Sequence, residues 1–306
     1  AVLAVSGGAD SLSLLEAMVR LRDSLRVTLH VAHCDHGIRP SSPDDADFVR
    51  ARAAEHGVGF HLGHADPKPP KGRSLEEHLR DQRGAFLIEI ANEVGAARIL
   101  TGHTLDDQAE TVLMNLLTGA GRRGLGGMPP TRWRTGRPLI DMRRSDTEDF
   151  CKALGLEPRL DETNLDPNFL RNRIRHQIIP LLREINPRLD VHLAHLSDVS
   201  RDEDYLLDAA AVVAIPPQAR EAAGAVSLEA LHLAPMALQR RVVRLLARNE
   251  HLALTGAQVD QILAMSRTGR EGASVDLDGA LSAWLEDGLL MLGRAPSGEP
   301  DPGDDA

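Results

Sequence analysis

The sequence has little of what several large classes of protein require. Among 306 residues there are two cysteines, Cys34 and Cys151, whose spacing fits neither a zinc site nor a disulfide framework. Aromatic residues make up only 3% of the chain, so its core must be built from Leu, Val, Ile and Ala. We find no signal peptide and no apolar run long enough to span a membrane. We therefore expect a reduced, cytoplasmic setting without membrane contact.

The balance of charge sets a second limit. The formal net charge of −10 argues against a uniformly basic nucleic-acid binder, although it leaves room for local basic patches. The length and the 42% apolar content suit two domains. We expect these at residues 1–185 and 186–298, followed by an acidic tail at 299–306. Because the chain begins inside an apolar run, we also expect further residues upstream.

Strand-like and helix-like segments alternate through the first part of the chain. Such alternation predicts an α/β fold, doubly wound, with a mainly parallel five-stranded sheet and helices on both faces. From about residue 186 the alternation stops, which predicts a smaller, mostly helical second domain with a long helix over 191–213. Weak strand patterns follow at 273–277 and 283–292. The five strands of the main sheet are expected at 1–5, 27–32, 59–65, 97–101 and 137–141.

A glycine-rich turn follows the first expected strand. It reads Ser6, Gly7, Gly8, Ala9, Asp10 and Ser11, and an amphipathic helical pattern begins directly after it. Glycines let the backbone approach a ligand, and a helix N-terminus attracts anions, so this pattern predicts a phosphate site. It is neither a Walker A loop nor a dinucleotide fingerprint. A carboxylate beside phosphates requires a cation, so Asp10 indicates Mg²⁺. The alternative is a simple turn with Asp10 or Ser11 as helix cap.

A histidine and three acids follow the fourth expected strand. If the helix begins near Leu105, Asp106 and Glu110 share one face, Asp107 lies one position round, and His103 precedes the helix. Such a group could hold Mg²⁺ or orient an amine. The alternative is an acidic first turn that favours the helix dipole, which Asp106 and Asp107 fit well. Ligands of parallel sheets bind at the carboxyl ends of strands, so His103 should lie near the glycine turn.

Asp35 follows the second expected strand and should reach the same edge. It suits a general base or an anchor for an amine, whereas the alternative is an ordinary Asp/Gly turn. Glu77, Arg80 and Arg83 lie at helical spacing, which taken alone favours a self-paired helix surface.

A cluster of arginines stands out against the acidic average of the chain. Arg171 and Arg175 are four residues apart on one helical face, and Arg122 and Arg123 lie in a glycine-rich loop upstream. This local excess favours contact with the phosphate backbone of RNA. The alternative is a domain-joining helix with ordinary surface arginines.

Taken in order, these motifs closely resemble the tRNA(Ile)-lysidine synthetase family of the PP-loop ATP pyrophosphatases. The resemblance covers residue 1 to about 187, with Thr104 standing where many members carry a second histidine. It rests on Ser-Gly-Gly-x-Asp-Ser (6–11), Asp-His-Gly-x-Arg (35–39), Glu-x-x-Arg-x-x-Arg (77–83), Gly-His-x-x-Asp-Asp-Gln-x-Glu-Thr (102–111), the glycine loop 119–128 and Arg-Asn-Arg-x-Arg-His (171–176).

The resemblance implies a ligase that uses ATP and Mg²⁺. ATP would adenylate the C2 oxygen of the wobble cytidine in a tRNA(Ile) with a CAU anticodon, and the amine of free lysine would then displace AMP. By residue match, residues 6–11 would hold ATP, with Asp10 at the metal. The residues that would line the adenylation and lysine site are Asp35, Arg80, His103, Asp107 and Glu110.

Two other readings compete with this one. A related adenylating enzyme such as a tRNA thiolase would need paired cysteines, which Cys34 and Cys151 do not provide. A non-catalytic nucleotide- or RNA-binding module would not need the acids around His103. The sequence leaves the oligomeric state open, a homodimer included.

Overall fold

The computed structural model describes residues 1–37, 42–159, 169–215, 224–277 and 281–294. The chain forms two compact units, residues 1–199 and 200–306. The division falls inside helix α9 (Leu189–Ala214), later than the boundary we expected after residue 185. The long helix predicted over 191–213 is confirmed by α9. Across the described residues, no helix has both the length and the hydrophobicity needed to cross a bilayer.

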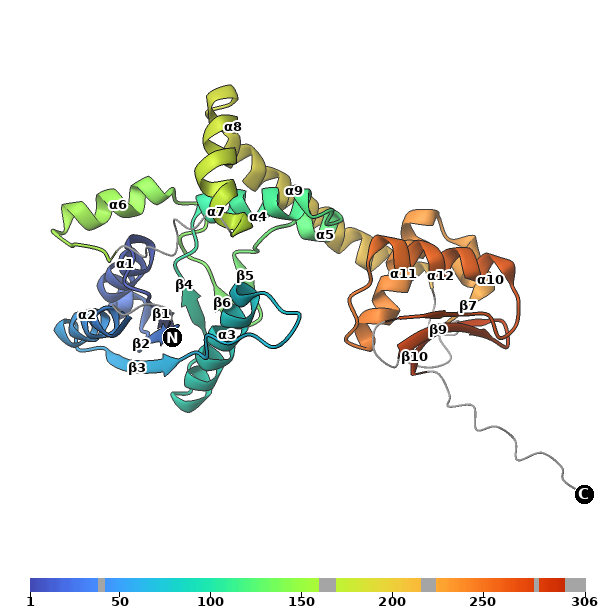
Figure 1. The fold of residues 1–306 in the computed structure, drawn as a ribbon, viewed down its shortest axis with the longest axis horizontal. Coiled ribbons are helices and arrows are strands. Elements are labelled where there is room, and N and C mark those ends of the chain that lie inside the picture. The colour runs from blue at the N-terminus through green and yellow to red at the C-terminus, as the bar shows by residue number, and fades with distance from the viewer. Residues whose placement is uncertain (38–41, 160–168, 216–223, 278–280, 295–306) are drawn as a thin grey trace, which may run out of the picture. The chain divides into compact units, whose positions relative to one another are not determined.

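The first unit is built on a six-stranded sheet in the order β3-β2-β1-β4-β6-β5 (Figure 1). All neighbouring strands are parallel except β5, which pairs antiparallel with β6 at the edge. The doubly wound, mainly parallel fold is therefore confirmed. The strands are β1 (Val2–Ala4), β2 (His30–Asp35), β3 (Gly59–His64), β4 (Ile99–Thr101), β5 (Thr131–Arg132) and β6 (Thr135–Gly136).

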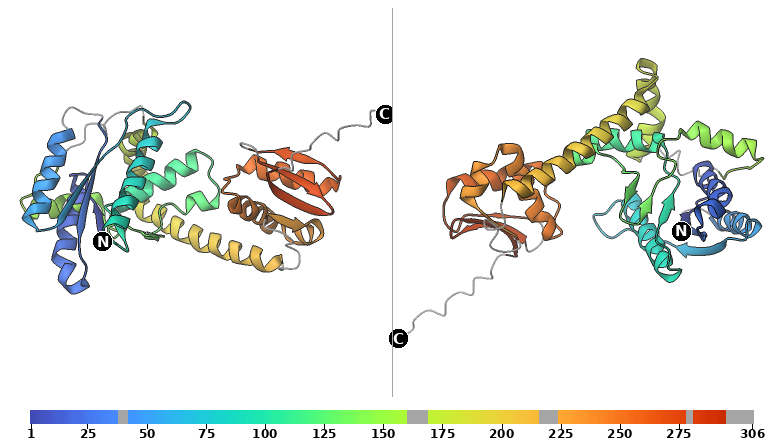
Figure 2. Two further views of the ribbon diagram at one scale, coloured as in Figure 1. Left: turned by 90° about the horizontal axis from the view of Figure 1, so that it is seen from below. Right: turned by 180° about the vertical axis from the view of Figure 1, so that it is seen from behind.

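Helices cover both faces of this sheet. Successive residues of a strand point to opposite sides, so apolar neighbours such as Val2 and Leu3 of β1 contribute to two separate cores. In β1, Leu3 packs in the core that contains α1 and α2 residues, whereas Val2 packs with α3 residues. The helices α1, α2 and α3 lie around the sheet (Figure 1, Figure 2). The helices of the unit are α1 (Ala9–Leu25), α2 (Ser42–Glu55), α3 (Leu75–Glu93), α4 (Leu105–Leu117), α5 (Arg122–Leu125), α6 (Arg144–Ala153), α7 (Leu170–Arg173), the π-helical η2 (Ile174–Ile178) and α8 (Ile179–Ile185).

One expected strand was wrong. Residues 137–141 form turns, and the strand that pairs with β4 lies just before them at β6. Pro138 has no N–H to donate to a ladder, and the backbone instead closes two turns, from Ile140 N–H to Arg137 and from Met142 N–H to Leu139. The apolar pattern reflects burial of Ile140, which is 5% exposed, in a turn.

The second unit carries a four-stranded antiparallel sheet in the order β7-β10-β9-β8. It has more strand than we expected, because the pattern at 283–292 is a hairpin that turns through Asp287 and Gly288, both with positive φ. The expected acidic tail lies outside the described residues. The elements are β7 (Ala225–Ser227), α10 (Leu228–Leu233), α11 (Met236–Asn249), α12 (Gly256–Thr268), β8 (Ser274–Asp276), β9 (Leu281–Glu286) and β10 (Leu289–Arg294).

The strand order of the first sheet reverses between β1 and β4. The chain runs from β1 to β2 and β3 on one side and then returns to place β4 on the other. Such a reversal opens a crevice at the carboxyl ends of the two strands. The two strand ends meet closely, because a Cβ on Gly102 would lie 2.8 Å from the carbonyl oxygen of Asp10. Only glycine therefore lets the turn after β4 pack against the start of α1.

A buried ion cluster holds α1 against α2. Glu16 of α1 is 2% exposed and accepts hydrogen bonds from Arg20 at 2.6 Å, from Arg52 of α2 at 2.5 Å and from His56 at 2.7 Å. Although burial raises it, these three partners bring the pKa of the Glu16 carboxyl down to about 2. The helix that begins at the glycine turn is thus fixed by charge as well as by apolar packing.

We expect Gly102→Ala to lower the free energy of unfolding by about 1–3 kcal/mol, because its methyl group would meet backbone rather than a flexible side chain. Gly84→Ala is the matched control. Gly84 lies inside α3 with nothing within 4 Å of an added Cβ, so alanine there should be neutral or stabilise by up to about 1 kcal/mol. Urea unfolding of the two variants makes the comparison, and equal stabilities would contradict it.

We expect Glu16→Gln to destabilise the chain by about 3 kcal/mol at pH 7, since it breaks a buried charged cluster. A folded pKa of about 2 lies below the unfolded value of about 4.3, so the carboxylate stabilises the fold above pH 4.3. That contribution is lost as the pH falls through this window, and the two unfolding curves should converge. The control Glu55→Gln, at an exposed partner of Arg52, should change stability by less than about 1 kcal/mol.

Candidate active site

The glycine turn is shaped by one hydroxyl group. Ser11 Oγ accepts hydrogen bonds from the N–H of Ser6 at 3.1 Å and of Gly7 at 3.2 Å, and it donates to the carbonyl of Gly8 at 2.9 Å. Gly7 has a φ of 96°, which other residues rarely adopt. The first-turn N–H groups of α1, from Ala9 onward, have no acceptor within the helix and face the crevice end of β1. The turn thus presents a preformed cradle for an anion.

Asp10 is held by residues from α6. Thr147 donates to its Oδ1 at 2.5 Å, and the Arg144 Nε lies 3.4 Å from its Oδ2. The helix α6 reaches this position by packing on α1, where Ser13 bonds to the Thr147 carbonyl at 3.0 Å. Burial raises the pKa of the Asp10 carboxyl, and nearby Asp107 adds to the effect, although Thr147 and Arg144 oppose it. Both carboxylate oxygens of Asp10 therefore have a hydrogen-bond donor from α6.

Two nearly inaccessible carboxylates lie at the start of α4. Asp107 is 7% exposed and Glu110 is 1% exposed. Three arginines form ion pairs with both acids. The distances to Asp107 are 3.0 Å from Arg144, 3.3 Å from Arg171 and 3.2 Å from Arg175. The distances to Glu110, in the same order, are 3.4, 2.9 and 2.6 Å. We call these five residues the charge cluster. Burial raises the pKa of Asp107, but Arg144 and Arg171 outweigh it and lower that pKa below its usual value.

Neighbouring groups fix the orientation of these acids. The N–H and hydroxyl of Thr104 donate to Asp107 Oδ2 at 2.9 and 3.0 Å, so Oδ1 is left for the arginines. Asp106 lies beside the charge cluster and accepts from Arg144 N–H at 2.9 Å and from Arg183 at 2.7 Å. The two predicted acids Asp107 and Glu110 therefore share one rigid site.

His103 lies in the turn between β4 and α4, with its Nδ1 at 2.8 Å from Thr101 Oγ1. Burial lowers the pKa of His103, Asp107 opposes this effect, and the positive charges of Arg83, Arg137 and Arg171 add to it, so that the pKa falls to about 4. The ring is neutral at pH 7. It can therefore donate or accept one hydrogen bond to a ligand but contributes no charge.

The structure does not bring all predicted residues into the charge cluster. Asp35 ends β2, accepts from the N–H of Gly37 at 2.8 Å and lies 3.7 Å from His64, so it forms the turn that we considered as the alternative. It still lies at the crevice edge of the sheet. Arg80 is exposed on α3 and makes no hydrogen bond or ion pair with another described residue.

The four predicted RNA-binding arginines divide into two pairs. Arg122 and Arg123 are exposed on α5. Arg171 and Arg175 instead point inward and belong to the charge cluster. Their role toward RNA stays a prediction, as do the roles of the other site residues.

Sequence reasoning did not assign four residues of this region to the site. Arg144 and Thr147 lie in the first turn of α6; the sequence indicates Arg144 only as one of several arginines suited to RNA, and only their position after the last parallel strand could have indicated the contacts with Asp10. Gly102 was part of a motif without an assigned role. Gln108, also in that motif, exchanges hydrogen bonds with the backbone of Met128 at 2.8 and 3.1 Å, and it thereby holds the glycine loop on α4.

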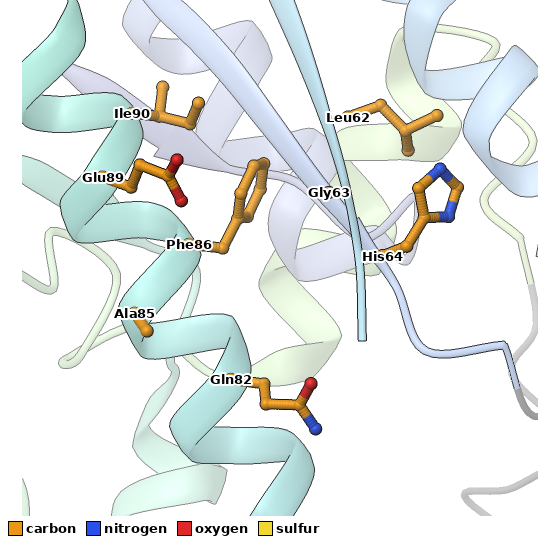
Figure 3. A pocket seen from close by; sticks show the side chains of 8 residues that line it. All are labelled: Leu62, Gly63, His64, Gln82, Ala85, Phe86, Glu89 and Ile90. Atoms are coloured by element: carbon orange, nitrogen blue, oxygen red, sulfur yellow. The ribbon is translucent and has the colours of Figure 1, made fainter. Parts of the chain in front are cut away.

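A separate cavity of about 470 Å³ lies between β3 and α3 (Figure 3). The Phe86 ring packs against Gly63, where a Cβ would come within 2.6 Å of it. Leu62 and His64 lie on the other side of the strand from Phe86 (Figure 3). The cavity contains none of the predicted site residues, so its size does not make it the active site.

The family comparisons agree with this geometry. A model of the PP-loop domain matches residues 1–182, and a model described as the TilS substrate binding domain matches residues 227–290. Among solved structures, the U34-tRNA thiolase NcsA of Methanococcus maripaludis, which has a 4Fe-4S cluster, superposes with a TM-score of 0.54 over 64% of this chain and 70% of its own. At 18% identity, that likeness concerns the fold alone.

Several curated relatives are named tRNA(Ile)-lysidine synthase. That of Gloeobacter violaceus is 40% identical over 79% of this chain and 75% of its own length. That of Symbiobacterium thermophilum is 38% identical over 90% of this chain but 61% of its own, and that of Dehalococcoides mccartyi is 39% identical over 68% and 47%. The chain thus spans about half to three quarters of these relatives. The geometry of the site, an anion cradle beside buried carboxylates, agrees with these matches. The chain therefore belongs to the tRNA(Ile)-lysidine synthase family of PP-loop proteins.

Proposed function

We propose that this chain ligates free lysine to C2 of the wobble cytidine in a CAU-anticodon tRNA(Ile), at the expense of ATP. The observation that carries the proposal is the placement of the anion cradle and of two buried carboxylates at one crevice, in a chain of this family. Phosphates and an amine are the two groups that such a reaction must bring together.

The cradle suits the phosphates of ATP. The first turn of α1 supplies backbone N–H donors, the glycines let a ligand approach the backbone closely, and the positive end of the helix favours negative charge. Asp10 lies in the first turn of α1 beside the cradle, and its carboxylate suits a Mg²⁺ ion, because Mg²⁺ uses one or two carboxylates together with phosphate oxygens. When bound, Mg²⁺ would offset charge on the departing pyrophosphate.

The carboxylates of the charge cluster, together with Asp10, are the groups that an ammonium of lysine would contact. Asp10, Asp107 and Glu110 carry three negative charges, and Arg144, Arg171 and Arg175 carry three positive ones. An entering ammonium would compete with the guanidiniums for the carboxylate oxygens of Asp107 and Glu110. We infer that Arg171 or Arg175 is released toward a phosphate, which would reconcile their inward position here with a role in RNA binding.

The proposed reaction has two steps. The C2 oxygen of cytidine attacks the α-phosphorus of ATP, and pyrophosphate leaves. The lysine amine, after losing its proton, attacks C2, and the C2–O bond breaks as AMP departs with that oxygen. We infer that the neutral His103 would hydrogen-bond to a substrate group at the crevice and that the carboxylates of Asp107 and Glu110 would hold the ammonium.

Thiolation is the competing reaction within the fold. Cys34 lies at the end of β2 and Cys151 is buried in α6, and burial raises the pKa of both thiols, which disfavours reactive thiolates. Among the described residues there is no group of three or more His, Cys, Asp or Glu side chains placed to hold a metal. We therefore favour lysine as the nucleophile.

The direct test incubates the chain with ATP, Mg²⁺, labelled lysine and a tRNA(Ile) transcript that has a CAU anticodon. We expect release of pyrophosphate and label at the wobble position. A transcript with a different wobble base is the control and should take up no label. Incorporation of sulfide or ammonia in place of lysine, or binding of tRNA without pyrophosphate release, would overturn the proposal.

We expect Glu110→Gln to separate the two steps. Loss of one buried charged hydrogen bond to the ammonium should raise the KM for lysine about 10- to 100-fold, whereas pyrophosphate release in a single turnover without lysine should persist. Glu93→Gln, at an exposed position near the end of α3, is the control and should leave both unchanged. A variant that loses pyrophosphate release but keeps its KM for lysine would contradict this role.

A further inference from the structure

The hairpin between β5 and β6 ends in an exposed tryptophan. Trp133 is one of two tryptophans in the chain and is 72% exposed. It forms the turn together with Arg134, because Arg132 and Thr135 are the last residues that pair on either side. No role in the proposed reaction falls to this hairpin.

The backbone at this tryptophan is unfavourable for its residue type. Trp133 has a φ of 52°, whereas Arg134 is not among the residues with positive φ. Two-residue hairpins with positive φ at the first turn position strongly prefer glycine there. A bulky residue therefore occupies a glycine position and also exposes a large apolar surface. An outlier of this kind directs attention to function.

Hydrogen bonds hold the turn in place. Arg98 donates to the carbonyl of Trp133 at 2.7 Å, and Arg134 donates to Asn92 Oδ1 at 2.6 Å and to the carbonyls of Ala91 and Ala96. The turn is thus fastened to the end of α3 and to the loop before β4. The indole is presented on a fixed support.

The arginines of the turn and of its support have no matching carboxylate. Arg98, Arg132 and Arg134 form no ion pair with an acid among the described residues, in a chain whose net charge is −10. Arg98 and Arg132 are exposed. An exposed ring beside uncompensated guanidiniums is the arrangement by which proteins bind single-stranded nucleic acid.

We propose that Trp133 stacks on an unpaired base of bound RNA while Arg98 and Arg132 contact the phosphates beside it. The turn precedes β6, and β6 runs parallel to β4, so it lies at the amino edge of the sheet, opposite His103. It would hold a part of the RNA away from the reacting cytidine. The inference rests on the proposed function, which supplies tRNA as the RNA.

The variant Trp133→Gly separates binding from folding. Glycine suits the positive φ, so the free energy of unfolding should stay equal or rise, whereas the dissociation constant for tRNA should increase about tenfold. At saturating tRNA, the rate of lysine incorporation should not change. Arg132→Gln should reduce the slope of log affinity against log salt by about one.

Tryptophan fluorescence tests the contact independently. The variant Trp284→Phe leaves Trp133 as the single tryptophan, so the emission reports on this residue alone. Its emission should be quenched by tRNA and shielded from acrylamide. The proposal would be overturned if Trp133→Gly bound tRNA with unchanged affinity or if it lost stability. It would also be overturned if the tryptophan became shielded from acrylamide as the protein concentration rose in the absence of RNA. Weaker RNA binding by Trp133→Gly, with no lysine incorporation by the unaltered chain, would reject the proposed reaction and leave this contact standing.

Discussion

The buried contact between two carboxylates and three guanidiniums is the constraint around which the first unit is arranged. Asp107 and Glu110 are almost inaccessible, and leaving either charge unpaired would cost several kcal/mol. Their partners come from α6 and from the segment formed by α7 and η2. Neither side is stable in this position without the other. The packing of α4, α6 and η2 is therefore dictated by charge neutralisation as much as by apolar surface.

Local patterns were sufficient to find the acids but not their partners. Strand ends and helical spacing are short-range features, so the sequence placed Asp35, His103, Asp107 and Glu110 at one edge of the sheet. The ion pairs of the charge cluster span 34 to 68 residues, and no local spacing encodes them. The sequence pattern therefore indicates contact of Arg171 and Arg175 with RNA, but not their ion pairs with Asp107 and Glu110. The strand expected at residues 137–141 was wrong for a related reason, since apolar residues of a buried turn look like a strand.

Thr104 shows how a departure from a family pattern can be accommodated. Its N–H and hydroxyl both occupy one oxygen of Asp107, which leaves the second oxygen to the arginines. A histidine at this position would carry an imidazole ring in place of the short hydroxyl side chain. The threonine instead caps α4 and orients the acid in one step, so helix initiation and site geometry depend on the same side chain.

The wide π-helical turn of η2 makes the number of residues between α7 and α8 important. A π-helical turn accommodates one more residue than an α-helical turn, and each residue of an α-helix rotates the chain by about 100°. Removing a residue here would therefore swing α8 round its own axis and carry Arg183 away from Asp106 and Asp190. In this stretch the spacing of residues matters as much as their identity, so natural variants should tolerate exchanges there better than insertions or deletions.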